Sequence, residues 1–195
     1  MDKRSLAALL VAATMSGSAY GITGNTIVYD DADENSFNHN NAACGSSFVY
    51  FEGDFVHTGT QAIALSRVDN NGVGWAGPIT YSTTTDYDGV AFWINAGNSP
   101  TTVTSLGVQD HAGTSHFLHL EQIYGGPLPA NMWIRFAIPF SSPAFEANFS
   151  TPPADFDQFC IINHSNGSQT TFIYVDDVTL TGADIFKSGF EVVPQ

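Results

Sequence analysis

Two pairs of adjacent aspartates interrupt apolar, strand-like stretches near opposite ends of the chain. Asp30 and Asp31 follow the residues IVY, and Asp176 and Asp177 stand inside FIYVDDVTL. Paired carboxylates in an otherwise apolar strand need a structural reason, and carboxylate oxygens are preferred ligands of Ca²⁺. The two pairs therefore predict a calcium ion that holds the two ends of one domain together.

Three histidines, His111, His116 and His119, suggest zinc at first sight. The segment around them reads as a β-strand, in which residues three apart point to opposite faces, so His116 and His119 cannot share an ion. We expect His119 to lie in a binding groove or at the surface.

Two carboxylates, Glu52 and Glu121, could act as the acid and base of a glycosidase. Their positions in the sequence do not set their separation, and no flanking motif supports the pair. We assign no catalytic residue and predict a protein that is not an enzyme. A small polysaccharide-active enzyme stays open as an alternative.

The elements that would position these groups are short segments rich in Val, Ile, Phe, Tyr and Thr, bounded by Gly, Asn, Asp, Ser or Pro. This pattern is typical of an all-β, antiparallel two-sheet β-sandwich, and helical periodicity is nearly absent. Ten strands are expected, at residues 25–29, 47–55, 61–67, 75–81, 89–95, 102–109, 116–123, 132–140, 156–163 and 171–180.

Alternation within the strands predicts which side chains face outward. In GVAFWINAG the apolar set is Val90, Phe92 and Ile94, so Trp93 and Asn95 point the other way. By the same rule Gln109 and Arg135 point outward from their strands. If these strands belong to one sheet, Trp93, Asn95, Gln109 and Arg135 share an outer face.

The N-terminus resembles a secretory signal peptide at residues 1–19, with Lys3 and Arg4 before an apolar run and small residues before Ala19. The apolar run is too short to span a bilayer. We expect a secreted, extracellular or periplasmic protein with one domain at residues 20–182 and a short tail at residues 183–195. The tail contains IFKSGFE, which resembles a terminal element of some exported proteobacterial proteins.

The chain is acidic, with 5 Lys and Arg against 19 Asp and Glu and a net charge of −14. A surface of this sign repels phosphate, so nucleic acid and anionic membranes are excluded as partners. Divalent cations or neutral ligands such as carbohydrates suit it better. Cys44 and Cys160 either form a disulfide after export or stay as two buried thiols, and their spacing leaves both open.

Eight blocks occur in an order and spacing similar to those of a known family. They are IVYDD, HTGTQAIALSR, GWAGPITY, YDGVAFWINAG, TSLGVQD, WIRFAIPF, FDQFCIINH and FIYVDDVTL, spread over residues 25–181. Together they resemble the galactose-binding-like jelly roll of carbohydrate-binding modules from secreted bacterial polysaccharidases.

The resemblance implies a structural calcium held by Asp30, by backbone oxygens near Thr60 and by Asp176. It also implies a sugar site, either in a groove on one sheet or in loops at the sandwich edge, in which aromatic rings stack on the sugar. Trp93, Asn95, Gln109, Arg135 and His119 are the candidates for the groove. Trp75 and Tyr81, together with Tyr87 and Tyr124, are the candidates for the edge.

The leading prediction is therefore a secreted, non-catalytic protein that binds a glycan or polysaccharide and is stabilised by calcium. A structural or adhesive extracellular protein, which binds another protein or no small ligand, is the alternative from a different class.

Overall fold

The computed structural model describes residues 25–34, 37–40, 49–67, 71–83, 86–101, 104–145, 153–164, 171–182 and 191–194. Within these residues, no helix is long and apolar enough to cross a membrane. The predicted signal peptide, Cys44 and residues 183–190 of the tail lie outside the described part, so the signal peptide and export stay predictions.

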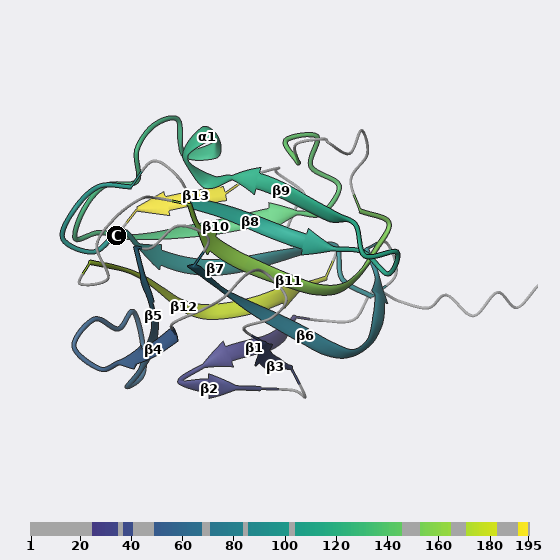
Figure 1. The fold of residues 1–195 in the computed structure, drawn as a ribbon, viewed down its shortest axis with the longest axis horizontal. Helices are drawn as coiled ribbons and strands as arrows, with labels where there is room; N and C mark the ends of the chain where they lie inside the picture. The colour runs from purple at the N-terminus through teal and green to yellow at the C-terminus, as the bar shows by residue number, and fades with distance from the viewer. Residues whose placement is uncertain are drawn as a thin grey trace, which may run out of the picture.

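Two antiparallel sheets form a sandwich (Figure 1). Sheet A contains, in spatial order, β13 (Glu191–Pro194), β10 (Trp133–Pro139), β7 (Gly89–Asn95), β12 (Phe172–Thr181), β1 (Thr26–Asp30) and β2 (Ala32–Asp33), while β5 (Ala62–Ser66) pairs with β12 and β4 (Val49–Glu52) pairs with β5. Sheet B contains β3 (Asn38–Asn40), β6 (Asn71–Ser82), β11 (Asp155–Asn163), β8 (Thr104–Gln109) and β9 (Ser115–His119). The all-β, two-sheet prediction is confirmed.

The core lies between the sheets and follows the predicted alternation. On β7, Val90, Phe92 and Ile94 are buried and Trp93 is half-buried. Phe92 stacks on Phe136 of the neighbouring strand β10, with ring centroids 5.8 Å apart. Burial of one such side chain contributes about 1.5–3 kcal/mol to folding, so the apolar parity of each strand decides which face turns inward.

One predicted strand is partly wrong. Residues 116–123 were expected to be extended, but the chain forms β9 and then the one-turn helix α1 (Leu120–Tyr124). Gly125 ends the helix at a positive φ of 88°, and its N–H donates to the carbonyl of Glu121. Leu120 is buried in the helix, as it would be in a strand, so its apolar character did not distinguish the two structures.

Strands β2, β3 and β13 were not predicted. The last of them comes from the tail and pairs with β10 at the edge of sheet A. The end of the predicted tail is therefore part of the sandwich.

Cys160 is buried in β11, and the described part of the chain contains no free cysteine. Because Cys44 lies outside the described residues, a bond between the two stays a prediction.

Candidate functional site

The predicted outer face is divided between the two sheets. Arg135 of β10 lies directly opposite Trp93 of β7 in sheet A, whereas Gln109 ends β8 in sheet B. The prediction that Gln109 shares a face with Trp93 is therefore wrong, because the outward faces of the two sheets are opposite sides of the sandwich. Asn95 is also unsuited to a groove, since it is buried and its Oδ1 accepts a bond from the Gly97 N–H.

One face of the Trp93 ring is covered by a histidine. The His57 ring stacks on it with centroids 3.9 Å apart and an interplanar angle of 19°, and it meets Trp133 edge-on. Nδ1 of His57 lies 2.5 Å from Oδ2 of Asp177, which holds the imidazole in place. A sugar ring therefore cannot stack on that face of Trp93.

Trp75 and Tyr81 belong to the core and not to the edge of the sandwich. Trp75 is 0% exposed and stacks on Phe159, and Tyr81 is buried against Phe37. Both side chains are removed from the candidates for ligand contact.

His119 points outward from sheet B, and His116 points inward and is buried. The strand thus separates the two histidines, as its alternation predicted. Nδ1 of His119 lies 2.8 Å from Oγ of Ser105, and its ring meets that of His164 edge-on.

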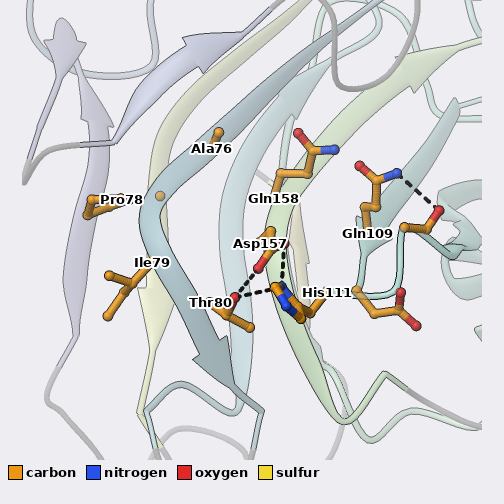
Figure 2. Close-up of a pocket in the computed structure, with 11 residues that line it drawn as sticks. Ala76, Pro78, Ile79, Thr80, Gln109, His111, Asp157 and Gln158 are labelled. Carbon is orange, nitrogen blue, oxygen red and sulfur yellow. Dashed lines mark hydrogen bonds and ion pairs between the residues drawn. The ribbon is translucent and has the colours of Figure 1, made fainter.

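A hollow of about 410 Å³ lies on the outer side of sheet B (Figure 2). It is lined by β6, by β11, by the end of β8 and by the turn between β8 and β9, through Ala76, Gly77, Pro78, Ile79, Thr80, Gln109, Asp110, His111, Gly113, Asp157 and Gln158. Gln109 is the one predicted ligand residue among these.

Three side chains in the hollow form a closed hydrogen-bonded cluster (Figure 2). Oγ1 of Thr80 donates to Oδ1 of Asp157 at 2.5 Å and lies 3.0 Å from Nδ1 of His111. The same nitrogen lies 3.2 Å from Oδ2 of Asp157. The cluster fixes the orientation of a carboxylate and an imidazole that both reach solvent, with side chains 41% and 72% exposed.

Two side-chain amides stand beside this cluster. Gln109 and Gln158 are direct neighbours across β8 and β11 (Figure 2). Nε2 of Gln109 donates to the Gly113 carbonyl at 3.2 Å, and no described residue forms a hydrogen bond with the Gln158 side chain. The two amides therefore present donors and acceptors side by side.

Sequence reasoning did not find Thr80, Asp157 or Gln158, and it considered His111 only as a zinc ligand. Alternation points Gln109 outward, but the neighbours of Gln109 depend on which strands flank β8. That pairing joins residues about fifty positions apart, and no local pattern encodes it.

Three carboxylates converge on the loop at residues 57–61, at the place predicted for calcium. Oδ1 of Asp31 accepts the N–H groups of Thr60 and Gln61 at 2.6 and 2.7 Å. Oδ2 of Asp176 accepts the His57 N–H at 2.9 Å, and Oδ1 of Asp177 accepts the Thr58 hydroxyl at 2.6 Å. Asp31 directly follows β1, and Asp176 and Asp177 belong to β12; Figure 1 shows both strands in sheet A.

Of the first acidic pair, Asp31 lies against this loop. Asp30 is exposed and belongs to the β1–β2 pairing. The prediction names Asp30, Thr60 and Asp176, but Asp31 and not Asp30 contacts Thr60, and the ion itself stays a prediction.

Charge at this junction is reflected in three pKa shifts. Burial raises the pKa of the Asp176 carboxyl, and the N–H groups of His57 and Asp177 oppose that rise. The N–H groups of Thr60 and Gln61 lower the pKa of Asp31. Burial, with the nearby Asp176 and Asp31 charges, raises the pKa of the Tyr29 phenol. Burial is therefore the main cause of the shifts at Asp176 and Tyr29, and backbone N–H groups are the main cause at Asp31.

The candidate glycosidase acids lie apart in the fold. Glu52 ends β4 in sheet A, whereas Glu121 lies in α1 beside sheet B. Glu121 is 8% exposed, its Oε1 accepts the Thr104 N–H at 2.7 Å, and its Oε2 is buried with no hydrogen-bond partner among the described residues. This carboxylate holds the start of β8 and has no access to substrate.

Burial raises the pKa of Glu121. The folded state therefore binds a proton at Glu121 more readily than the unfolded chain does. The resulting contribution to the free energy of unfolding is present below the pKa of the unfolded chain, near 4.5, and is lost as the pH rises through the pKa of the folded state. We expect Glu121→Gln to stabilise the protein by about 1 kcal/mol at neutral pH, because the buried charge is removed and the bond to Thr104 is kept.

Urea unfolding of the wild type and of Glu121→Gln at several pH values will test this prediction. The difference between them should shrink toward acidic pH, and a constant difference would contradict the assignment. Gln122→Glu on the exposed side of α1 is a control that adds a carboxylate to the same helix without burying it.

No family model and no curated protein matches this sequence. Among solved structures, the chain is similar to the family 11 carbohydrate-binding module from Clostridium thermocellum in complex with a beta-1,3-1,4-mixed-linked tetrasaccharide, with a TM-score of 0.53 and 14% identity over 84% of this chain and 98% of that chain. A xylan-binding domain of family 22 gives a TM-score of 0.50 and 12% identity over 82% and 96% of the two chains. A family 29 carbohydrate-binding module gives 0.50 and 10% over 82% and 92%. The protein has the jelly-roll β-sandwich fold of carbohydrate-binding modules.

Proposed function

We propose that this protein binds a glycan in the hollow on sheet B and does not act on it as an enzyme. The observation that carries the proposal is the grouping of the Gln109 and Gln158 amides with the Asp157 cluster on one open sheet face. Sugar hydroxyls both donate and accept hydrogen bonds, and amides with an adjacent carboxylate supply both kinds of partner. The similar family 11 module, which is in complex with a tetrasaccharide, supports the choice of ligand class.

The hollow differs from the expected aromatic platform, because none of the residues that line it is Trp, Tyr or Phe. Apolar surface comes instead from Ala76, Pro78 and Ile79, and Ile79 is 62% exposed. Without a stacked ring, the hydrogen-bonding side chains should decide the affinity. The two glutamines are therefore the residues to test.

We expect Gln158→Ala and Gln109→Ala each to weaken glycan binding about tenfold, which corresponds to the loss of a hydrogen-bonding group worth about 1.4 kcal/mol. Pull-down on insoluble polysaccharides, followed by calorimetry with soluble oligosaccharides, measures this effect. Gln122→Ala on the exposed side of α1 is the matched control and should bind as the wild type does.

Equal glycan binding by Gln158→Ala, Gln109→Ala and Gln122→Ala would show that the glycan does not bind in the hollow. Wild-type protein that binds no neutral, acidic or basic glycan would reject the proposed function and favour the structural or adhesive alternative.

We also propose a structural calcium ion where β1, the loop at residues 57–61 and β12 meet. The convergence of Asp31, Asp176 and Asp177 on this loop supports it. In the described part of the chain, no three Asp, Glu, His or Cys side chains are grouped closely enough to hold one ion. An ion at this junction would therefore be held by at most two carboxylates, with carbonyl oxygens near Thr60 as the further ligands.

Calcium should raise the melting temperature relative to protein in chelator. At a hundredfold excess over the dissociation constant the stabilisation is about 2.7 kcal/mol, which corresponds to roughly 5–10 °C for a domain of this size. Asp176→Asn should abolish the shift, and Asp54→Asn, which changes an exposed acid earlier in the same connection between β4 and β5, should keep it. A wild-type melting curve that is the same in calcium and in chelator would reject the ion.

A further inference from the structure

The hollow on sheet B is lined by negative and neutral groups and by no lysine or arginine. Asp110 and Asp157 line it, and Asp155 adjoins it by accepting the His111 N–H at 3.0 Å. His111 is the one lining side chain that can become positive. A ligand that enters the hollow therefore meets a negative potential.

Asp157 is arranged to accept a further hydrogen bond. Each of its oxygens has one partner in the cluster, Thr80 for Oδ1 and His111 for Oδ2. A carboxylate offers about four acceptor positions, so each oxygen keeps one for a ligand. Because the side chain is 41% exposed and held from both sides, an incoming donor finds the carboxylate already oriented.

Asp110 adds a second fixed charge to the lining of the hollow. Burial alone would raise its pKa, but the Thr114 N–H and His116 outweigh that effect, so its pKa lies below the ordinary value. Its Oδ1 accepts the Thr114 N–H at 2.7 Å, and its Oδ2 lies 3.4 Å from Nε2 of His116. The hollow therefore stays negative under mildly acidic conditions.

These charges discriminate among classes of sugar. The carboxylate of a uronic acid would find no lysine or arginine in the hollow and would be repelled by Asp157. A neutral sugar can form only ordinary hydrogen bonds with the amides. A protonated amino group would form a charge-assisted bond with a carboxylate, which is roughly twice as strong as a neutral one.

We propose that the hollow selects glycans that carry free, protonated amino groups, such as polymers of glucosamine. This inference rests on the proposed glycan-binding function and names the class of sugar that the same site takes. The Asp157 carboxylate accepts the ammonium group, and the Gln109 and Gln158 amides bind the hydroxyls beside it.

The test is calorimetry with four hexasaccharides, namely those of glucosamine, N-acetylglucosamine, glucose in β-1,4 linkage and galacturonic acid. It is run at about pH 6, where the carboxylates are ionised and the amines are protonated. About 150 mM salt reduces the Debye length to roughly 8 Å and so screens attraction to the acidic surface as a whole. Wild-type protein should bind the glucosamine hexamer at least tenfold more tightly than either neutral hexamer, and the galacturonate most weakly.

Asp157→Asn keeps an acceptor for Thr80 and removes the charge. It should reduce the preference for the glucosamine hexamer to less than about threefold and leave the affinity for the neutral hexamers nearly unchanged. Asp54→Asn makes the same change of charge at an exposed loop on the side of sheet A and should keep the preference.

The outcomes separate this inference from the function on which it rests. Neutral hexamers that bind through Gln158 with no preference for amines overturn the inference and leave glycan binding in place. If Asp157→Asn and Asp54→Asn lose the preference for the glucosamine hexamer equally, the preference comes from the net charge of the chain and the inference is overturned. Hexalysine that binds as tightly as the glucosamine hexamer, and equally through Asp157, shows recognition of ammonium groups without the sugar and also overturns it. Binding to none of the hexasaccharides rejects the proposed function itself.

Discussion

Replacement of Arg67 by methionine is expected to lower the free energy of unfolding by about 3 kcal/mol or more. Arg67 is 7% exposed, and its guanidinium donates to three backbone carbonyls, those of Ala96, Ser99 and Pro100. Among the described residues no carboxylate pairs with it. The side chain therefore stabilises the turn after β7 by donating to one buried and two partly buried carbonyls, and methionine would remove all three hydrogen bonds.

The Arg67 backbone adds to this junction. Its N–H donates to the Thr171 carbonyl at 2.7 Å, just before β12 begins. Arg67 thus joins the end of β5, the turn after β7 and the start of β12 at one end of the sandwich. Methionine keeps the backbone bond, so the measured loss reports on the guanidinium.

Urea unfolding of Arg67→Met and Arg135→Met measures the effect with a matched control. Arg135 is half-buried on the outer face of sheet A, and its replacement should cost less than about 1 kcal/mol. Similar losses for the two variants would contradict the role assigned to the Arg67 carbonyl contacts.

Trp75→Ala should cost about 3–5 kcal/mol, because it removes the largest fully buried side chain and leaves a cavity between the sheets. The ring packs against Phe159 with centroids 5.4 Å apart. Its Nε1 has no hydrogen-bond partner among the described residues, so Trp75→Phe should cost much less than Trp75→Ala. Chemical unfolding of both variants checks the prediction, and equal losses would mean that ring volume is not what matters at this position.

Trp93→Ala separates packing from ligand binding in the same series. The Trp93 ring lies on sheet A and is covered by His57, whereas the hollow lies on sheet B. We expect a loss of about 1–2 kcal/mol from the broken aromatic contacts and glycan affinity within about twofold of the wild type. A folded Trp93→Ala protein that no longer binds glycan would place the site on sheet A.

The two predicted sites agree with the structure to different degrees. For the acidic junction the prediction chose Asp30, but Asp31 is the aspartate that contacts Thr60, while Asp176 contacts His57 of the same loop, and the calcium ion itself stays a prediction. The aromatic groove was placed incorrectly, since Trp93 is covered, Trp75 is in the core and Gln109 lies on the other sheet. An acidic pair in an apolar strand is a local anomaly that sequence displays directly. A groove depends on which strands are neighbours in the sheet, and no short stretch of sequence indicates those neighbours.

Residues alone determined the fold class and the inward parity of the strands that carry the core. Strand alternation has a period of two, so the sides of Phe92 and Ile94 could be read without knowing any partner strand. Only the tertiary structure decided that β7 and β8 lie in different sheets, and that Gln109 stands beside Gln158 at the hollow. The physical reason is that parity follows from the backbone of one strand, whereas sheet membership follows from hydrogen bonds between segments distant in the chain.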